Sequence, residues 1–437
     1  MAASSKSKKI THLANFQYPH FAKWDKRRTN VKFNVANIHN SMANAIRRIM
    51  LAEVPTVAFR DKPHAASTIH IKKNDTPLNN EMLAHRIALV PIAVAHPDKF
   101  RTDDYLFILD VSNDSSNVRY ITSADIRIKH IPTGKFLEER DVRRFFPADP
   151  ITGDYSIITV LKSRNYVKIP YNPELASMIP KDKDEEVNKL YVEMKAVIGN
   201  CCNGTDNSHF SPVCVSCYTN MVDPKLAEEG FATYLLAQKH LAEVNKTTPY
   251  TDEFLRKRFE VNERYKFYFK DERGEPNIFT YEIESVGVVP PLIIFNRAID
   301  ILKDKIMTFL NNLLSGNEEV IEVRPSTTMR GFEIYVANED DTLGNIVQCH
   351  LGRLYADYSL PEDKRLLGSI GYSRIHPCER RIRFLVASDK FAGLDEIAAK
   401  VFKPGCMEII HLLDTIQKEL TSSAPFVEEA RSISESI

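Results

Sequence analysis

The sequence predicts an α+β fold in which two weakly similar units of one chain pack as a pseudo-twofold heterodimer, with a β-rich domain inserted in the first unit. Three observations lead to this prediction. Short β-prone runs alternate with helical stretches, two long helical stretches carry apolar residues at heptad spacing, and a four-residue helix opening near the start of the chain recurs in its last quarter.

The composition is that of an ordinary folded protein. The 437 residues include 58 Lys+Arg and 58 Asp+Glu, so the formal net charge is zero, and 43% of them are hydrophobic. These values exclude a mostly disordered chain, and they exclude binding of nucleic acid or anionic membrane by bulk charge. The longest apolar runs, residues 87–95 and 286–295, are shorter than the roughly 20 residues of a membrane span, so we expect no membrane partner. Seven cysteines in so long a chain indicate unpaired thiols in a reducing, intracellular compartment.

The first unit begins after a polar, basic stretch that predicts a flexible tail over residues 1–29. Alternating apolar residues at 31–35 then predict a half-buried strand, and a helix follows from residue 40 to Pro55, which ends it. We expect Asn40 or Ser41 to cap this helix, because a side-chain oxygen there can accept hydrogen bonds from the free amides of the first turn.

The next part of the chain differs in pattern. Residues 96–189 contain short β-prone runs separated by Asn, Asp, Ser, Gly and Pro, which predicts an inserted β-rich domain. The first unit is therefore discontinuous and covers residues 30–95 and 190–318. The second unit is expected over residues 319–421, and a flexible tail over residues 422–437.

Two long helices are predicted by apolar stripes. The first begins after Pro290 and ends at Gly316, and the second follows Pro404. Heptad spacing is typical of a helix that packs along another helix, so these stripes are interpreted as dimerisation contacts. The residues are Phe295, Ile299, Leu302, Ile306, Phe309 and Leu313 in the first helix and Ile409, Leu413, Ile416 and Leu420 in the second. Further helices are expected over residues 224–244 and 252–263.

The repeated helix opening consists of a hydroxyl residue, an apolar residue, a small residue and Asn. Ser41 and Asn44 belong to the first copy, and Thr342, Gly344 and Asn345 belong to the second. The hydroxyl can cap the first turn, and the small residue allows another backbone to approach closely. Two such units would pack about a pseudo-twofold axis with their long helices side by side.

Several longer segments resemble the α-like subunits of cellular RNA polymerases, which are the bacterial α subunit, the archaeal D subunit and the third subunit of eukaryotic RNA polymerase II. These segments are residues 40–56, 81–92, 209–213 (HFSPV) and 284–291. Residues 332–347 and 371–386 resemble instead the smaller partner, the archaeal L subunit or the eukaryotic eleventh subunit. The resemblance therefore joins two normally separate chains, in a head-to-tail fusion similar to those of large DNA viruses of eukaryotes.

The resemblance implies a non-catalytic assembly and scaffold subunit of a multisubunit DNA-directed RNA polymerase. The two largest subunits would dock on this intramolecular heterodimer for DNA-templated transcription, and small zinc-bearing polymerase subunits would bind it as well. DNA would be reached only indirectly, through the complex. The implied location is the host nucleus or a cytoplasmic viral factory, with the virion as a further place.

Three arginines are candidates for docking the large subunits. Arg47 and Arg48 splay away from the apolar face of their helix, so they are expected to reach solvent or the carboxylates of a partner. The resemblance adds that α-like subunits use the matching arginine pair to grip a large catalytic subunit. By the same resemblance Arg86 has an anchoring role.

Four cysteines form a pattern that suggests a metal. Cys201, Cys202, Cys214 and Cys217 could close a tetrahedral zinc site. However, Cys214 and Cys217 fall in a strand-like run, where a spacing of three places their side chains on opposite faces, and this favours unpaired thiols. We therefore expect no cofactor.

No catalytic residues are expected, because the chain lacks a P-loop and the Asp-x-Asp-x-Asp triplet of two-metal nucleotidyl transfer. Two other classes of function remain open. One is a stand-alone nucleic-acid-binding transcription regulator, which the neutral charge disfavours. The other is a zinc-dependent enzyme built on the four cysteines.

Overall fold

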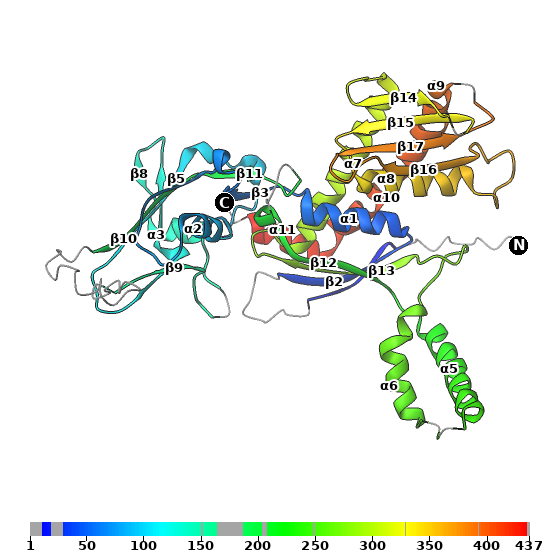
Figure 1. Ribbon diagram of the computed structural model, residues 1–437, viewed down its shortest axis with the longest axis horizontal. Helices are drawn as coiled ribbons and strands as arrows, with labels where there is room; N and C mark the ends of the chain where they lie inside the picture. The colour runs from blue at the N-terminus through cyan, green and yellow to red at the C-terminus, as the bar shows by residue number, and fades with distance from the viewer. Residues whose placement is uncertain are drawn as a thin grey trace, which may run out of the picture.

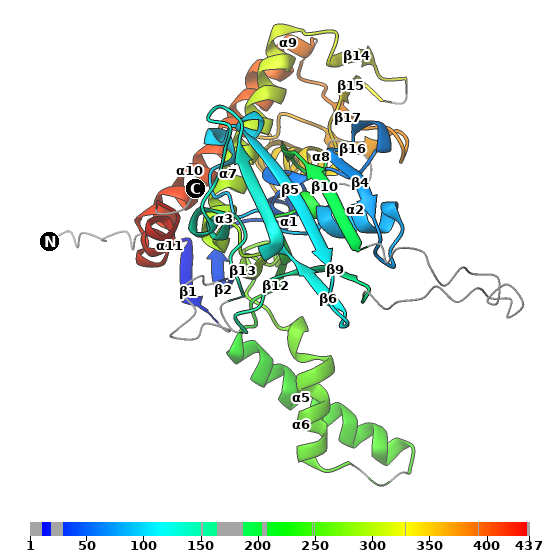
Figure 2. The same ribbon diagram turned by 90° about the vertical axis from the view of Figure 1, so that its left-hand side faces the viewer.

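The computed structural model describes residues 11–18, 29–149, 152–163, 187–202, 208–246, 248, 250–327, 329–391 and 393–434. Two antiparallel sheets lie on opposite sides of a layer of helices, a β-rich domain lies to one side, and a helical hairpin projects away from the body (Figures 1 and 2). Within the described ranges, no helix is long and apolar enough to cross a membrane.

The first sheet has the order β1-β2-β13-β12. Its strands are β1 (Leu13–Gln17), β2 (Asn30–Ala36), β12 (Val213–Asn220) and β13 (Ile278–Ser285). The predicted strand before the first helix is confirmed as β2, in which Val31, Phe33 and Val35 are completely buried. The helix α1 (Asn40–Ala52) follows β2, and α7 (Pro291–Ser315) follows β13. As predicted, α7 begins at the Pro290/Pro291 pair and ends at Gly316, which adopts the left-handed conformation (φ 64°).

The second sheet has the order β14-β15-β17-β16. Its strands are β14 (Ile321–Pro325), β15 (Gly331–Ala337), β16 (Ser369–Arg374) and β17 (Arg381–Ala387). After its second strand comes α8 (Asp341–Leu351), which continues into a π-helical turn, η7 (Gly352–Ala356). After its fourth strand come α9 (Leu394–Ile397), η8 (Ala398–Phe402) and α10 (Lys403–Ser422). Both sheets thus place their strands in the order first, second, fourth, third, with a helix after the second strand and a long helix after the fourth.

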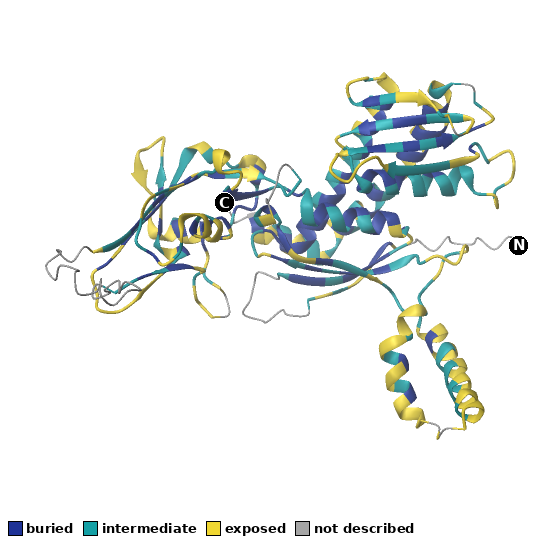
Figure 3. Cartoon of the chain, viewed as in Figure 1, coloured by how far each residue is buried: buried dark blue, intermediate teal, exposed yellow. Residues whose placement is uncertain are grey.

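One continuous core joins the two sheets through the central helix layer, which we define as α1, α7, α8 and α10. Every residue assigned to the two apolar stripes is buried in it. Figure 3 shows that burial is concentrated in this layer and on the strands that face it, while the hairpin is largely exposed. The apolar stripes therefore lie between the sheets and away from the outer surface.

Helix α7 connects the two sheets physically. Near its start, the ring of Phe295 packs edge-on against Phe33 of β2 at a centroid distance of 5.1 Å. Near its end, the ring of Phe309 lies 5.6 Å from Phe384 of β17. A helix of 25 residues is roughly 37 Å long, which is enough to begin on one sheet and end on the other.

Helix α10 makes the reverse connection. It starts beside the second sheet and ends beside the first, where the Glu419 carboxylate accepts hydrogen bonds from the backbone amides of His12 (2.7 Å) and Leu13 (3.2 Å). Along the way, Lys303 of α7 forms an ion pair with Asp414 of α10 at 3.0 Å. The two long helices are therefore neighbours in the central layer.

Both expected tails need correction. Residues 13–17 form β1, which pairs with β2, so the predicted tail over residues 1–29 is wrong for this segment, and its residues 1–10 and 19–28 lie outside the described ranges. Residues 424–434 form a helix, α11 (Ala424–Ser434), which packs on α7 and α10. Its Glu429 is only 2% exposed and accepts a hydrogen bond from the Leu292 amide at 2.9 Å. Because Pro290 supplies no side-chain cap, this carboxylate takes that place at the start of α7.

The inserted domain is β-rich, as the turn pattern predicts, but it is larger than residues 96–189. Its main sheet has the order β4-β10-β5-β7-β8, and the pairs β11-β3 and β6-β9 complete it. The strands are β3 (Thr56–Phe59), β4 (Ile69–Asn74), β5 (Tyr105–Asn113), β6 (Arg119–Thr122), β7 (Ile126–His130), β8 (Lys135–Phe136), β9 (Ile157–Leu161), β10 (Asn188–Met194) and β11 (Ala196–Gly199), with helices α2 (Asn80–Ala88) and α3 (Glu139–Phe145). A separate core extends from Val57 to Ala196, so strands on both sides of the expected boundaries belong to this domain.

The projecting hairpin lies between β12 and β13 and consists of α5 (Pro224–Val244) and α6 (Asp252–Asn262). These are the two helices expected in this region, and both are confirmed. The ring of Phe259 packs between Phe231 (5.3 Å) and Phe267 (5.6 Å). Only a few residues of each helix are buried, so the hairpin is held to the body mainly through the strands that it connects.

Candidate assembly interface

The repeated helix openings meet in the central layer, where α1 packs against α8. The expectation that their hydroxyl residues are the caps is wrong. The N-cap of α1 is His39, whose Nδ1 accepts from the Ser41 amide at 3.1 Å, and the N-cap of α8 is Asp340, whose carboxylate accepts from the Thr342 amide at 2.9 Å. Ser41 and Thr342 lie two positions further on and are buried, and the Ser41 hydroxyl lies 2.8 Å from Nδ1 of His39.

The remaining members of the repeat have local roles. Asn44 accepts hydrogen bonds from the Arg47 guanidinium at 2.8 and 3.0 Å, and Asn345 accepts a bond from the Cys349 thiol at 3.3 Å. At Gly344 a Cβ atom would lie 2.4 Å from the ring of Tyr372 on β16. The small residue therefore allows close approach of an aromatic ring and not, as expected, of another backbone.

Arg48 connects the two halves of the chain. Its Nε donates to the Thr342 hydroxyl at 2.9 Å, and its Nη2 lies 3.2 Å from the Asp340 carboxylate. Burial alone would raise the pKa of Asp340. The positive charges of Lys305 and Arg48 and the hydrogen bonds from Thr342 outweigh burial and hold this pKa below its usual value. Arg48 thus has a carboxylate partner within the same chain.

The other two predicted docking arginines also have partners within the chain. Arg47 contacts Asn44 on its own helix, as described above. Arg86 donates to the backbone carbonyls of Ile157 (3.0 Å) and Ile158 (2.6 Å), and it thereby fixes α2 to β9 in the β-rich domain. The structure does not bring Arg86 together with the arginine pair of α1.

A buried ion-pair cluster lies at the junction of three elements. Lys305 of α7 is 2.9 Å from Glu53, the residue that ends α1, and 3.3 Å from Glu339, which precedes α8. The side chains are only 10%, 12% and 17% exposed. Burial would lower the pKa of Lys305, but the two carboxylates outweigh it and raise this pKa above its usual value. This cluster is absent from the sequence-based prediction, because its three members are far apart along the chain.

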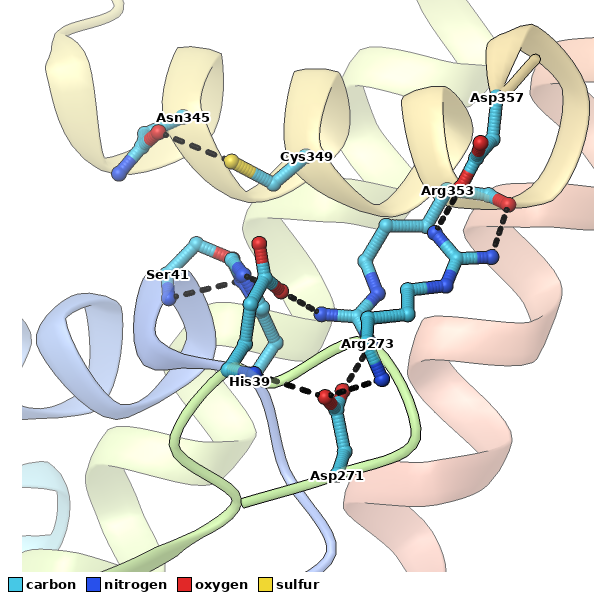
Figure 4. A network of polar contacts seen from close by, with 9 residues as sticks. His39, Ser41, Asp271, Arg273, Asn345, Cys349, Arg353 and Asp357 are labelled. Carbon is cyan, nitrogen blue, oxygen red and sulfur yellow. Dashed lines mark hydrogen bonds and ion pairs between the residues drawn. The ribbon is translucent and has the colours of Figure 1, made fainter. Parts of the chain in front are cut away.

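A second polar cluster closes the other end of the α1–α8 contact, and we call it the Arg353 cluster (Figure 4). Arg353 of η7 pairs with Asp271 and Glu275, both in the turn before β13, while Arg273 of the same turn pairs with Asp357 at 2.6 Å. The His39 Nε2 lies 3.3 Å from Glu275. Because Nδ1 of His39 accepts from the Ser41 amide, Nε2 carries the proton and donates to this carboxylate.

His350 lies in a cavity of about 320 Å³ beside the Arg353 cluster. Burial, together with the positive charge of Arg353 and the neighbouring His39, lowers the pKa of His350 to about 4. Its Nε2 is 4.0 Å from the Glu408 carboxylate and finds no hydrogen-bond partner within the described ranges. The imidazole is therefore neutral near pH 7.

The four cysteines of the possible zinc site are not assembled. Cys214 and Cys217 lie on β12, whereas Cys201 and Cys202 lie in the turn after β11. Among the described residues, no three His, Cys, Asp or Glu side chains form a group able to hold a metal ion. Burial, with a smaller contribution from Cys202, raises the pKa of Cys201 to about 11, which keeps this thiol protonated and a poor metal ligand.

Comparison with known proteins now assigns the family. The family model described as the RNA polymerase Rpb3/Rpb11 dimerisation domain matches residues 32–306, which is more than half of the chain. The chain belongs to this family. The match covers most of β2, strands β12 and β13, the whole β-rich domain, the hairpin and the first part of α7.

Relatives of this Rpb3/Rpb11 family protein include subunits of several polymerases. It is 27% identical over 312 residues to the RPAC1 subunit of DNA-directed RNA polymerases I and III from Homo sapiens, covering 65% of this chain and 81% of that protein. It is 25% identical over 298 residues to the DNA-directed RNA polymerase subunit Rpo3 from Pyrococcus furiosus, covering 66% of this chain and 95% of that protein. A segment of 61 residues is 43% identical to subunit 3 of DNA-directed RNA polymerases II, IV and V from Arabidopsis thaliana, covering 14% and 17%.

Replacing Lys305 with Met is expected to lower the free energy of unfolding by about 3–5 kcal/mol, because Glu53 and Glu339 would remain buried without a compensating charge. Chemical denaturation measures this change. Adding Glu53→Gln and Glu339→Gln to the Lys305→Met variant should recover most of the loss. The control is Lys418→Met, an exposed lysine of α10. A Lys305→Met chain as stable as that control would show that the cluster does not stabilise the interface.

Acidification from pH 6.5 to pH 4 is expected to remove about 3 kcal/mol of stability through His350 alone, because the unfolded chain binds a proton in this range that the folded chain excludes. The folded-state pKa is lowered, so stability rises with pH between these limits. Unfolding measured across this range should show a flatter profile for His350→Gln than for the wild type. Identical slopes for the two proteins would contradict this assignment.

Proposed function

We propose that this chain is a non-catalytic assembly subunit of a multisubunit DNA-directed RNA polymerase, in which both partners of a dimerisation pair are fused. Membership of the Rpb3/Rpb11 family and the similarity to RPAC1 and Rpo3 subunits support the polymerase role. The single observation that supports the fusion is the second sheet with its helices, which lies beyond residue 306 and repeats the strand order and helix placement of the first.

In this proposal the two units are related by a pseudo-twofold axis. Helix α1 corresponds to α8 and α7 corresponds to α10, so a twofold operation maps the α1–α8 contact and the α7–α10 contact onto themselves. Residues 319–421 would then take the place of the smaller partner. A short connection after Gly316 joins the two units. It keeps the effective concentration of one unit around the other at millimolar values or higher, and it removes one bimolecular assembly step.

The fused body would provide surfaces for the two largest polymerase subunits and for small zinc-bearing subunits. Of the predicted docking arginines, Arg47 is the strongest candidate, because its only side-chain partner within the described chain is the neutral amide of Asn44. Arg48 is engaged with Asp340 and would act chiefly between the units. The viral origin and the location in a nucleus, viral factory or virion stay predictions of the family resemblance, and the absence of a cofactor stays a prediction from the spacing of the cysteines.

Cleavage between the units tests the fusion. A protease site inserted after Gly316 in the full chain is expected to give, after cutting, two fragments that still elute together in size-exclusion chromatography, because the central helix layer holds them. Matched cutting in the hairpin loop at residue 248, away from this layer, serves as the control. Fragments that separate after the first cut in native buffer would contradict an intramolecular heterodimer.

Replacing Arg47 with Glu tests the polymerase role. Co-expressed with the two largest subunits of the same polymerase, this variant should keep the wild-type melting temperature and lose at least tenfold in recovered complex, because a charge-assisted contact is reversed. Arg48→Glu, which places a second carboxylate beside Asp340, should lower the melting temperature instead. Full recovery of the complex with Arg47→Glu would contradict docking by this residue, and a wild-type chain that recovers neither large subunit would contradict the polymerase role.

A further inference from the structure

The β-rich domain contains a cavity of about 730 Å³ that no part of the proposed assembly uses. Its walls are the loop at residues 61–67, one turn of α2, and four consecutive residues of β4, Ile69 to Lys72. Successive side chains of a strand point to opposite faces of the sheet. A cavity lined by four consecutive residues therefore lies along the edge of β4 and not over one face.

This edge of β4 has no strand beside it in the described part of the chain, and of its backbone groups the Ile69 amide donates to the Ser67 hydroxyl at 3.3 Å. The strand is the last in the order β4-β10-β5-β7-β8, and in the described part of the chain it pairs only with β10. A strand with one unpaired edge can accept an extended peptide by backbone hydrogen bonding. The β-bulge in the β4–β10 register and the adjacent lysines, Lys72 and Lys73, disfavour pairing with the same edge of a second copy.

A carboxylate in the cavity wall has no adequate partner. The side chain of Asp61 is only 4% exposed, and its Oδ1 has no hydrogen-bond donor within the described ranges. The nearest basic group is Nδ1 of His209, 4.0 Å away, and its side chain is 2% exposed. Burial lowers the pKa of His209, so the imidazole is neutral near pH 7 and does not balance the carboxylate. Removing a carboxylate from water without such compensation is costly.

From these observations we infer that the open edge of β4 binds an extended segment of a partner protein, whose arginine or lysine side chain enters the cavity and pairs with Asp61. We expect the partner's residues on either side of that arginine or lysine to be neutral or acidic, because the exposed residues around the cavity include Lys72 and His70. Glu81, also in the wall, would add a second acceptor for the incoming side chain. This inference is independent of the proposed polymerase role.

Peptide binding to the full chain tests the inference. The probe is a fluorescein-labelled pentapeptide, Glu-Val-Arg-Val-Glu, and fluorescence anisotropy measures its dissociation constant. Replacing the arginine by citrulline, which keeps the shape without the charge, should weaken binding at least tenfold. Methylating alternate backbone nitrogens of the peptide should weaken binding similarly, because it prevents strand pairing. No binding at millimolar peptide, or equal binding of the citrulline peptide, would overturn the inference.

The matched protein variant is Asp61→Asn. It should weaken binding of the arginine peptide at least tenfold, and it should also raise the melting temperature of the free chain, because an unpaired buried charge is removed. A purely structural Asp61 would give the opposite shift, so a lower melting temperature would overturn the inference. Glu138→Gln, an exposed carboxylate of the same domain, should change neither quantity. Unchanged peptide binding by Asp61→Asn would likewise overturn it.

Discussion

Burial of the apolar stripes on α7 and α10 is the constraint on which the rest of the structure depends. Each of these helices begins beside one sheet and ends beside the other, so both helices help to cover the inner faces of both sheets, together with α1 and α8. A helix that is apolar along its whole length on one side cannot be stable in water without such partners. The two sheets and the four central helices therefore form one core, and the two sheets are expected to depend on each other for folding.

Charged residues lie at both ends of the α1–α8 contact between the two sheets. Lys305 lies between Glu53 and Glu339, and Arg48 reaches Asp340, so groups from both halves surround one end of the α1–α8 contact. The Arg353 cluster does the same at the other end. Apolar burial supplies most of the association free energy and tolerates sliding of one helix along another, whereas buried ion pairs are favourable in only one register. These clusters thus explain how an interface rich in Ile and Leu can have a unique geometry.

The β-rich domain has its own core and is bound to the first unit through the chain segments on either side of it. Its strands β3, β4, β10 and β11 come from segments that the turn pattern alone places in the first unit. The hairpin of α5 and α6 is likewise an insertion between two paired strands, β12 and β13, which remain adjacent in the first sheet. Both insertions extend from the edges of the central body, so they add surface without disturbing the core between the sheets.

The sequence by itself determined the local elements and the repeat. Alternation identified β2, the proline pair and Gly316 bounded α7, and heptad spacing identified six of the twelve buried residues of α7 and four of the six of α10, because each of these signals lies within one stretch of chain. Only the tertiary structure decided the partners of the charged residues. Lys305 and Glu53, or Arg48 and Asp340, are hundreds of positions apart, and no local pattern distinguishes them from solvated charges. The tertiary structure also decided where α11 packs, because Glu429 accepts hydrogen bonds from the Leu292 amide at the start of α7 and from the Tyr18 hydroxyl, both far away in the sequence.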